Sequence, residues 1–329
     1  MTGSPLVTVI AVCYNHSKFV IECLDSIRNQ TYHHVQLIIM DDCSQDDSVG
    51  IIRDWIKRYG IECNFIAHQK NQGLCRTLNE ALELAQGEYI SIVATDDLWL
   101  PEKLAMQVEV LERLSSDVGV VYGDSWQITE EGELLPELLL KPYQERYGAL
   151  PEGDIYSRLI EGDFIPALNP LTRRGCYDLV GQYDERLSYE DWDMWLRIAQ
   201  KFKFSFLPQV VTKYRHVSNS MTRTIHEKRT IPRYRSDFLI FSKHVKNPSL
   251  SQNQRQRLKK RLIRDAEVLY ELNAPDRVAF LWRAAYLTRS LRISIICCIA
   301  IFLPHYRLYC FQRQFFVWKK RLTKMARDI

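Results

Sequence analysis

Short apolar runs alternate with segments of helical periodicity along the first 130 residues of the chain. The runs at residues 6–12, 35–40, 64–67 and 89–93 predict four strands. The first run is apolar at nearly every position, which is typical of a strand covered on both faces. Residues 18–28 and 74–86 carry apolar side chains at helical spacing between these strands. This order predicts βαβ units built around a parallel sheet.

Three helix boundaries are also marked in the sequence. Residues 44–47 (Ser-Gln-Asp-Asp) predict a capping box that opens a helix after the second strand, with Ile52 and Ile56 facing inward. Gly87 is expected to end the helix before the fourth strand. Pro101 is expected to begin another helix, because its missing N–H costs nothing at a first helical position.

Polar and acidic residues follow the predicted strands where each one ends. Tyr14 and Asn15 follow the first strand, Asp41 and Asp42 the second, and residues 95–97 (Thr-Asp-Asp) the fourth. Open α/β sheets bind ligands at the carboxyl ends of their parallel strands. The sequence therefore predicts a ligand site at this edge.

The usual phosphate-binding motifs do not occur in the sequence. The turn at residues 13–17 contains no glycine, and no GxxxxGK[ST] motif is found anywhere in the chain, so dinucleotide-binding and P-loop functions are excluded. Carboxylates repel phosphates unless a divalent cation lies between them. Oxygen ligands of this kind favour Mg²⁺ or Mn²⁺.

Composition places the chain among folded proteins and reveals an uneven distribution of charge. Of its 329 residues, 46% are hydrophobic and 26% charged, which excludes general disorder. Nine cysteines without a CxxC pair favour a reducing cytosol, and no signal peptide is expected at the start. Residues 1–220 hold 20 Lys and Arg against 33 Asp and Glu, whereas residues 221–329 hold 24 against 7. A basic region of this kind suits an anionic membrane, a nucleic acid or a phosphorylated substrate.

Five segments together resemble glycosyltransferase family 2. They are residues 6–15, 39–44 (Ile-Met-Asp-Asp-Cys-Ser), 71–73 (Asn-Gln-Gly), 95–101 with Trp99 and Pro101, and 189–197 (Tyr-Glu-Asp-Trp-Asp-Met-Trp-Leu-Arg). The resemblance covers about residues 5–222. It implies a GT-A nucleotide-sugar-binding α/β fold with a mostly parallel central sheet, a divalent metal and inversion at the anomeric carbon. We therefore expect a catalytic domain at residues 1–222 and a basic α-helical region at residues 223–329.

The resemblance assigns the donor side residue by residue. Tyr14 would pack on the nucleotide base, and Asp42 would accept a hydrogen bond from uracil or thymine; the alternative for Asp42 is a loop acid that helps to start the next helix. Asp96 would bind the metal that bridges the donor diphosphate, and Asp97 would contact the sugar or ribose. Ala94 departs from the family's motif, which has an acidic residue at that position.

The remaining assignments concern the reaction and the acceptor. The resemblance makes Asp191 the general base, and it places Glu190, Phe164 and Pro166 on the acceptor side. His216 would bind the metal or touch the diphosphate. The alternative for Asp191 is an acid that only stabilises the first turn of a helix through the helix dipole.

Residues 223–329 contain no catalytic motif. Helices are predicted at residues 257–271 and 276–289, and the apolar run at residues 293–303 is too short to span a bilayer. Residues 306–327 mix aromatic and basic side chains, as in a helix that lies in a membrane interface. The alternative is a helix docked on this protein or on a dimer partner.

The resemblance, together with the basic region, favours a hexosyltransferase-type enzyme. It would use a UDP- or dTDP-sugar and Mn²⁺ or Mg²⁺, and act on a glycan or lipid-linked acceptor of cell-surface polysaccharide synthesis. It would be cytoplasmic or peripheral on the inner membrane face. One alternative is an inactive nucleotide-binding scaffold. A nucleic-acid binder is less favoured, because the first part is acidic and no RNP, KH or zinc-finger signature occurs. A hydrolase that uses Asp96 and Asp191 as an acid pair is a further alternative.

Overall fold

The computed structural model describes residues 3–218, 220–226 and 228–302. The chain divides into two compact units, Met1–Ser220 and Met221–Ile329, which are described separately. The segment at residues 306–327, which the sequence predicts as an interfacial helix, lies outside the described residues.

Among the described residues, nine strands of the first unit form one mixed sheet in the order β3-β2-β1-β4-β8-β6-β9-β5, with β7 paired to β6. The strands are β1 (Val7–Cys13), β2 (Val35–Asp41), β3 (Asn64–Ala67), β4 (Tyr89–Ala94), β5 (Leu98–Trp99), β6 (Val118–Ile128), β7 (Leu134–Leu138), β8 (Leu171–Arg173) and β9 (Lys203–Arg215). The strands β3, β2, β1 and β4 are mutually parallel, and β8 joins them antiparallel to β4. This is the α/β class predicted from the sequence.

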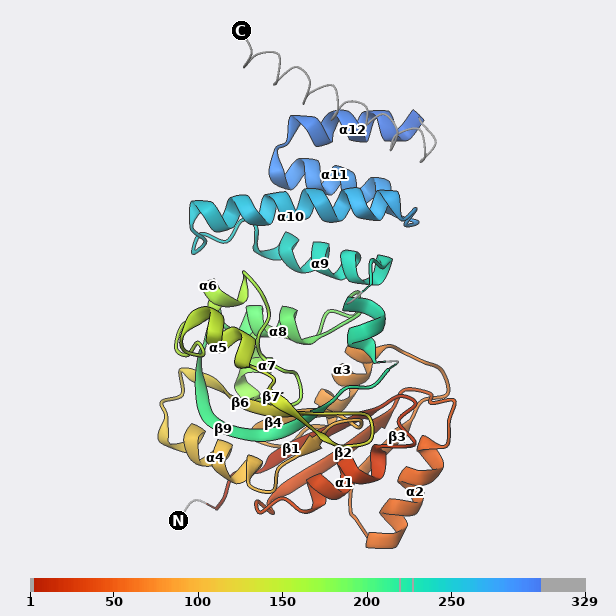
Figure 1. The fold of residues 1–329 in the computed structure, drawn as a ribbon, viewed down its shortest axis with the longest axis vertical. Coiled ribbons are helices and arrows are strands. Elements are labelled where there is room, and N and C mark those ends of the chain that lie inside the picture. Colours follow the sequence, from red (N-terminus) through yellow and green to blue (C-terminus); the bar gives the residue numbers. More distant parts are fainter. Residues whose placement is uncertain (1–2, 219, 227, 303–329) are drawn as a thin grey trace. The chain divides into compact units, whose positions relative to one another are not determined.

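Helices cover both faces of this sheet (Figure 1). They are α1 (Val20–Arg28), α2 (Ser48–Tyr59), α3 (Leu74–Leu84), α4 (Lys103–Arg113), α5 (Lys141–Tyr147), α6 (Tyr156–Leu159), α7 (Arg174–Val180) and α8 (Asp191–Ile198). Figure 1 shows α1, α2 and α4 on one face, and α3, α7 and α8 on the other. The crossover through α3 therefore changes face as the chain passes from β3 to β4.

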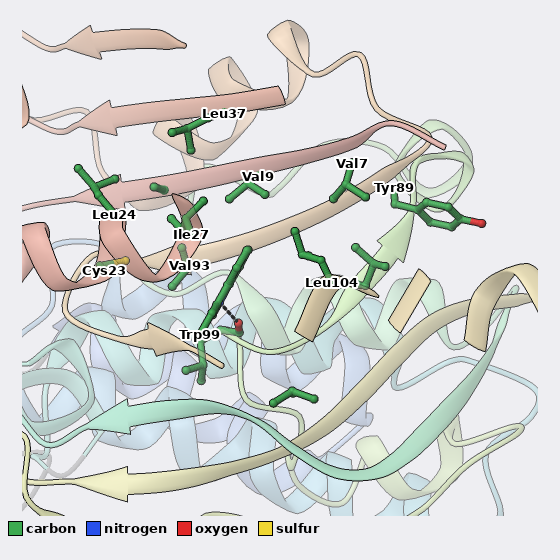
Figure 2. Close-up of a cluster of buried hydrophobic side chains, with 14 of the residues drawn as sticks. Val7, Val9, Cys23, Leu24, Ile27, Leu37, Tyr89, Val93, Trp99 and Leu104 are labelled. Carbon is green, nitrogen blue, oxygen red and sulfur yellow. Dashed lines mark hydrogen bonds between the residues drawn. The ribbon is translucent and has the colours of Figure 1, made fainter. Parts of the chain in front are cut away.

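The main core lies between the sheet and the face that carries α1, α2 and α4. Val7 and Val9 of β1 point into it and are fully buried. Leu24 of α1 and Leu104 of α4 meet these side chains from the helix side, as Figure 2 shows. The apolar face predicted for residues 18–28 thus contributes to the core.

The three predicted helix boundaries differ from those observed. Helix α3 ends at Leu84, before Gly87, and α4 begins at Lys103, two residues after Pro101. Ser44 does not cap α2; its hydroxyl donates a hydrogen bond to Oδ2 of Asp41 at 2.6 Å. The helix begins at Ser48, and Asp47 before it makes no side-chain capping bond. Ser44 thus belongs to the loop after β2, where the carboxylate of Asp41 competes for its hydroxyl.

The second unit is helical where it is described. It contains η1 (Thr222–His226), α9 (Ile231–His244), α10 (Gln252–Glu271), α11 (Arg277–Thr288) and α12 (Leu291–Phe302). Phe238 of α9 and Phe280 of α11 meet edge to face with ring centroids 4.9 Å apart. Over the described part of the chain, no helix combines the length and the apolar character needed to cross a membrane.

Candidate functional site

The carboxyl ends of β1, β2 and β4 meet at one edge because the strands are paired in register. Cys13 of β1 pairs with Asp41 of β2, and Val12 of β1 pairs with Ala94 of β4. Backbone hydrogen bonds continue past the strand ends: the Thr95 amide donates to the Val12 carbonyl at 2.9 Å. Tyr14, Asp42 and Asp96, which the sequence assigns to the donor side, are thus brought to the same edge.

Tyr14 lies at the surface of this edge, with 46% of the side chain exposed. The next residue, Asn15, adopts a left-handed conformation with φ of 59°, which asparagine tolerates better than most residues. Its amide donates to the Ser44 hydroxyl at 2.8 Å, and its side-chain oxygen accepts from the Gln45 amide at 2.7 Å. Tyr14 is thus exposed at the carboxyl end of β1.

Asp42 is buried and holds the loop that leads into α3. Its Oδ1 accepts from the Gln72 amide at 2.7 Å, and its Oδ2 accepts from the Gly73 amide at 2.8 Å. His68 Nδ1 lies 2.9 Å from the same Oδ1. Gly73 has φ of 85°, a conformation that favours glycine. The contact between Asp42 and a base stays a prediction. The two amides that Asp42 binds precede α3, not α2, which is the next helix along the chain.

Asp96 and Asp97 follow β4 in different environments. Asp97 is buried, and its Oδ1 accepts a hydrogen bond from the Arg215 amide at 2.8 Å. Burial, followed by repulsion from Asp96, raises the pKa of Asp97 well above its usual value. Oδ1 of Asp96 is also buried, yet it accepts no hydrogen bond from any described residue. Such an oxygen is accounted for by a water or an ion, since no described residue supplies a partner.

A divalent cation fits this oxygen. Among the described residues, no group of three or more His, Cys, Asp or Glu side chains converges on one point, so Asp96 would share the ion with ligands from elsewhere, such as a diphosphate. His216 lies next to Arg215, whose guanidinium Nε donates to the Asp96 carbonyl at 2.8 Å. The imidazole Nε2 of His216 lies 2.9 Å from Oε1 of Gln127.

A second group of acids lies at the start of α8. Asp191 is the first residue of this helix and Glu190 precedes it. The Trp192 amide donates to Oδ1 of Asp191 at 2.7 Å. Both acids border a pocket of about 10 Å³, room for about one water molecule. Its lining consists of Ile90, Ile92, Ala167, Pro170, Thr172, Tyr177, Tyr183, Glu190, Asp191 and Trp195.

The pocket shifts the proton affinity of these acids. Burial raises the pKa of Asp191 to about 6. Burial and the neighbouring charge of Asp191 raise the pKa of Glu190 to about 8. A third acid, Asp163, belongs to the same group, because burial and repulsion from Asp191 raise its pKa well above the usual range. Asp191 therefore ionises before Glu190 and can accept a proton near neutral pH.

The sequence did not identify Asp163 as a functional residue, although it stands between Gly162 and Phe164 in the predicted acceptor-side segment. Phe164 is buried, and its ring lies 6.2 Å from that of Tyr122. Pro166 is partly exposed. The structure thus places Asp163, rather than the buried Phe164, beside the acids.

Helix α3 and strand β4 connect the donor-side acids, Asp42 and Asp96, with the acids at the start of α8. Gly73, bound by Asp42, precedes α3, and Cys75 in its first turn donates to the Leu187 carbonyl at 3.6 Å, just before the acids of α8. Ile92 of β4 lines the acid pocket, and Asp96 follows it by four residues, a span of at most about 13 Å. Both groups therefore lie along the carboxyl-terminal end of β4.

Known proteins share this sequence pattern and this fold. Residues 8–156 match the family described as Glycosyl transferase family 2. An uncharacterised glycosyltransferase of Rickettsia felis is 27% identical over 226 residues, which are 67% of this chain and 36% of the relative. The chain thus spans about a third of that relative's length. TuaG of Bacillus subtilis, a glycosyltransferase assigned provisionally to teichuronic acid biosynthesis, is 26% identical over 220 residues, which are 66% of this chain and 82% of TuaG.

Two solved structures share the fold at low sequence identity. Staphylococcus aureus TarS 1–349 in complex with UDP-GlcNAc has a TM-score of 0.60 at 16% identity, covering 89% of this chain and 86% of the other. The mannosyltransferase PcManGT of Pyrobaculum calidifontis, in complex with GDP-Man and Mn²⁺, has a TM-score of 0.57 at 19% identity. The match covers 95% of this chain and 85% of the mannosyltransferase. The fold is therefore the GT-A type that the sequence predicted. Residues 8–156 of the chain thus carry the sequence of glycosyltransferase family 2, a family of transferase enzymes.

Proposed function

We propose that this chain transfers a sugar, with inversion, from a nucleoside-diphosphate donor to an acceptor hydroxyl. The observation that carries the proposal is the buried, unpartnered oxygen of Asp96 at the edge shared by β1, β2 and β4. Residues 1–222 form the catalytic domain in this proposal. Tyr14 packs on the base, Asp42 accepts a hydrogen bond from it, and Asp97 faces the ribose or sugar.

Asp191 is the general base. It accepts the proton of the acceptor hydroxyl while the hydroxyl oxygen forms a bond to the anomeric carbon. The bond from that carbon to the diphosphate oxygen breaks on the opposite face, and the nucleoside diphosphate leaves with the electron pair. Because the pKa of Asp191 is about 6, the carboxylate is ionised at neutral pH and still basic enough to take the proton.

Asp96 holds Mn²⁺ or Mg²⁺ in this proposal; the family resemblance also offered His216 as a ligand, but Nε2 of His216 lies 2.9 Å from Oε1 of Gln127. The ion would supply positive charge to the departing diphosphate. Glu190 is protonated near neutral pH, since its pKa is raised to about 8. Burial and repulsion from Asp191 also raise the pKa of Asp163. Phe164 and Pro166 belong to the acceptor side.

Calorimetric titration tests the donor site. The full chain is titrated with UDP, dTDP and GDP, each with and without Mn²⁺, beside the Asp96→Ala variant. We expect one nucleotide to bind only with Mn²⁺ and this binding to be lost in the variant. Absence of binding by any nucleotide would contradict the proposal. Binding without release of nucleoside diphosphate from any sugar donor and acceptor would instead identify a scaffold.

We also propose that the second unit brings the enzyme to an anionic membrane on the cytoplasmic side, where lipid-linked acceptors of polysaccharide synthesis would be reached. Its basic excess, 24 Lys and Arg against 7 Asp and Glu over residues 221–329, supports this. Trp282 and Tyr286 of α11 and Leu291 and Ile295 of α12 are exposed. Aromatic and aliphatic side chains among basic residues suit a membrane interface.

Sedimentation with vesicles tests the membrane proposal. We expect the full chain to sediment with vesicles containing phosphatidylglycerol and not with pure phosphatidylcholine vesicles. The Trp282→Ala/Tyr286→Ala double variant should sediment less, whereas Leu134→Ala, at an exposed position of the first unit, should behave as wild type. Equal binding to both kinds of vesicle, or to neither, would refute the proposal.

A further inference from the structure

We infer that His16 is a protein ligand, together with Asp96, of the divalent cation at the donor site. This inference rests on the proposed function, because it deepens the description of the same metal site. It concerns a residue of the loop after β1 that neither the sequence pattern nor the family resemblance assigned to any role.

His16 is held in place from two sides. Its backbone amide donates to the Ser48 hydroxyl at 3.0 Å, and its ring nitrogen Nδ1 lies 2.9 Å from the hydroxyl oxygen of Thr95. Nε2, at the other side of the ring, lies 3.7 Å from Oδ2 of Asp96. The ring is mostly buried, with 19% of the side chain exposed. The imidazole is thus oriented toward Asp96 in the absence of any ligand.

The separation of 3.7 Å between Nε2 and Oδ2 is too long for a hydrogen bond. It suits two ligands of a single ion. Ligand atoms at about 2.1 Å from an octahedral ion are about 3 Å apart in adjacent positions and about 4 Å apart in opposite positions. Asp96 also has Oδ1 buried without a partner among the described residues. An ion near this carboxylate would satisfy both residues.

The contact with Thr95 prepares the imidazole for this role. Histidines that bind metals usually donate their second ring N–H to an oxygen, which fixes the tautomer and the ring orientation. A neutral ring that donates from Nδ1 to Oγ1 of Thr95 presents the lone pair of Nε2 toward Asp96. Thr95 itself is fully buried, and its amide is bonded to the Val12 carbonyl. The hydroxyl therefore has a fixed position.

Two further observations favour His16. Ala94 stands where the family resemblance expects an acidic residue, so this chain has one carboxylate fewer near the ion. His216, the candidate from the sequence, has Nε2 at 2.9 Å from the side-chain oxygen of Gln127. A nitrogen ligand from the loop after β1 would replace the missing oxygen. It would also favour Mn²⁺ over Mg²⁺, which prefers oxygen ligands.

Electron paramagnetic resonance with Mn²⁺ tests the inference without measuring activity. The full chain is mixed with Mn²⁺ and with whichever of UDP, dTDP and GDP binds most tightly. The free Mn²⁺ signal gives the dissociation constant, and pulsed spectra report coupling of the bound ion to ¹⁴N of an imidazole. We expect a ¹⁴N coupling in wild type. In His16→Ala we expect it to disappear and the dissociation constant of Mn²⁺ to rise by about 10-fold or more.

Three variants make the result specific. His33→Ala, at an exposed histidine, and His216→Ala should keep the ¹⁴N coupling. Thr95→Val should keep His16 but weaken Mn²⁺ binding, and it provides a second test should His16→Ala fold poorly. Retention of both the coupling and the affinity in His16→Ala would overturn the inference, as would loss of the coupling only in His216→Ala. No Mn²⁺ binding by wild type with any nucleotide would instead overturn the metal site of the proposed function, and this inference with it.

Discussion

The backbone amide of Arg215 donates a hydrogen bond of 2.8 Å to Oδ1 of Asp97, although 118 residues separate them in the chain. The guanidinium of Arg215 is buried as well and donates to the carbonyl oxygens of Asp96 and Glu130 at 2.8 and 2.9 Å. Glu22 pairs with the same guanidinium. The end of β9 therefore fixes the loop that carries both acids of the donor site, which makes Arg215 a positioning residue.

Replacing Arg215 should weaken donor binding without removing any group that touches the donor. In Arg215→Met, the carbonyl oxygens of Asp96 and Glu130 lose a charged donor, at a cost on the order of 1 kcal/mol each, and the Asp96 loop loses its support. We expect nucleotide and Mn²⁺ to bind about 10- to 100-fold more weakly, measured by calorimetry. Arg113→Met, at an exposed residue of α4, is the control. Wild-type affinity in a folded Arg215→Met variant would show that the loop holds its shape alone.

The first half of the sheet could be predicted from the sequence because its strands are covered on both faces. Such strands appear in the sequence as continuous apolar runs. The run predicted at residues 6–12 differs from the observed β1 (Val7–Cys13) by one residue at each end. The second half could not be predicted in this way. The pairing of β6 with β9 shifts register in three places, and β9 contains Pro208, so neither strand has a simple alternation.

The same contrast applies to the candidate site. Asp42, Asp96 and Asp97 follow predicted strands, so their common edge could be predicted from the parallel order alone. The proximity of His16 to Asp96 could not, because it depends on the left-handed turn at Asn15 and on the Thr95 hydroxyl. Loop conformations of this kind have no periodic signal in the sequence.

Removing the proposed base should separate binding from chemistry. In Asp191→Asn the amide keeps the shape of the side chain but cannot accept the proton. We expect the transfer rate to fall on the order of 10²- to 10⁴-fold, while calorimetry shows donor binding similar to wild type. Asp178→Asn, at an exposed acid of α7, should transfer at the wild-type rate. A transfer rate in Asp191→Asn similar to that of wild type would mean that another group accepts the proton.

The pH dependence of transfer should report Asp191. Its pKa is raised to about 6, and the base must be ionised, so the rate should rise with pH through about 6 and then level off. Glu190 is still protonated in that range, since its pKa is about 8. Glu190→Gln should therefore leave the rise in place, as a pH profile of kcat/KM would show. If the midpoint of the rise shifts by a pH unit or more in this variant, Glu190 is the group whose ionisation controls the rate.

Glu190 should also make stability depend on pH. Its pKa is about 8 in the folded protein against an ordinary value of 4.5, so the protonated form favours folding. This contribution is fully present below pH 4.5 and is lost as pH rises through 8. Glu190→Gln has no such group to ionise. The Tm of this variant relative to the Tm of wild type should therefore rise between pH 5 and pH 9. Thermal melts measure this directly, and a constant difference in Tm would rule out a buried, titrating Glu190.

Lys103 should make stability depend on pH in the opposite direction to Glu190. Its Nζ is fully buried, donates to Ser91 and Gln107 at 2.7 and 2.9 Å, and lies 4.0 Å from the ring centroid of Trp99. Those three side chains each donate to a carbonyl of residues 168–170, beside the acid pocket. Burial lowers the pKa of Lys103 well below 10.5, so the neutral amine favours folding, and this contribution is lost as pH falls through the folded-state pKa.

Lys103→Met cannot take up a proton, so its Tm should improve relative to wild type as the pH is lowered from 10 to 6. Lys57→Met, at an exposed position of α2, should show no such trend. A difference in Tm between Lys103→Met and wild type that stays constant over this range would mean that Lys103 keeps its charge in the core. In that case the ring of Trp99 and the two oxygens would solvate the ammonium, and the segment at residues 168–170 would depend on a buried cation.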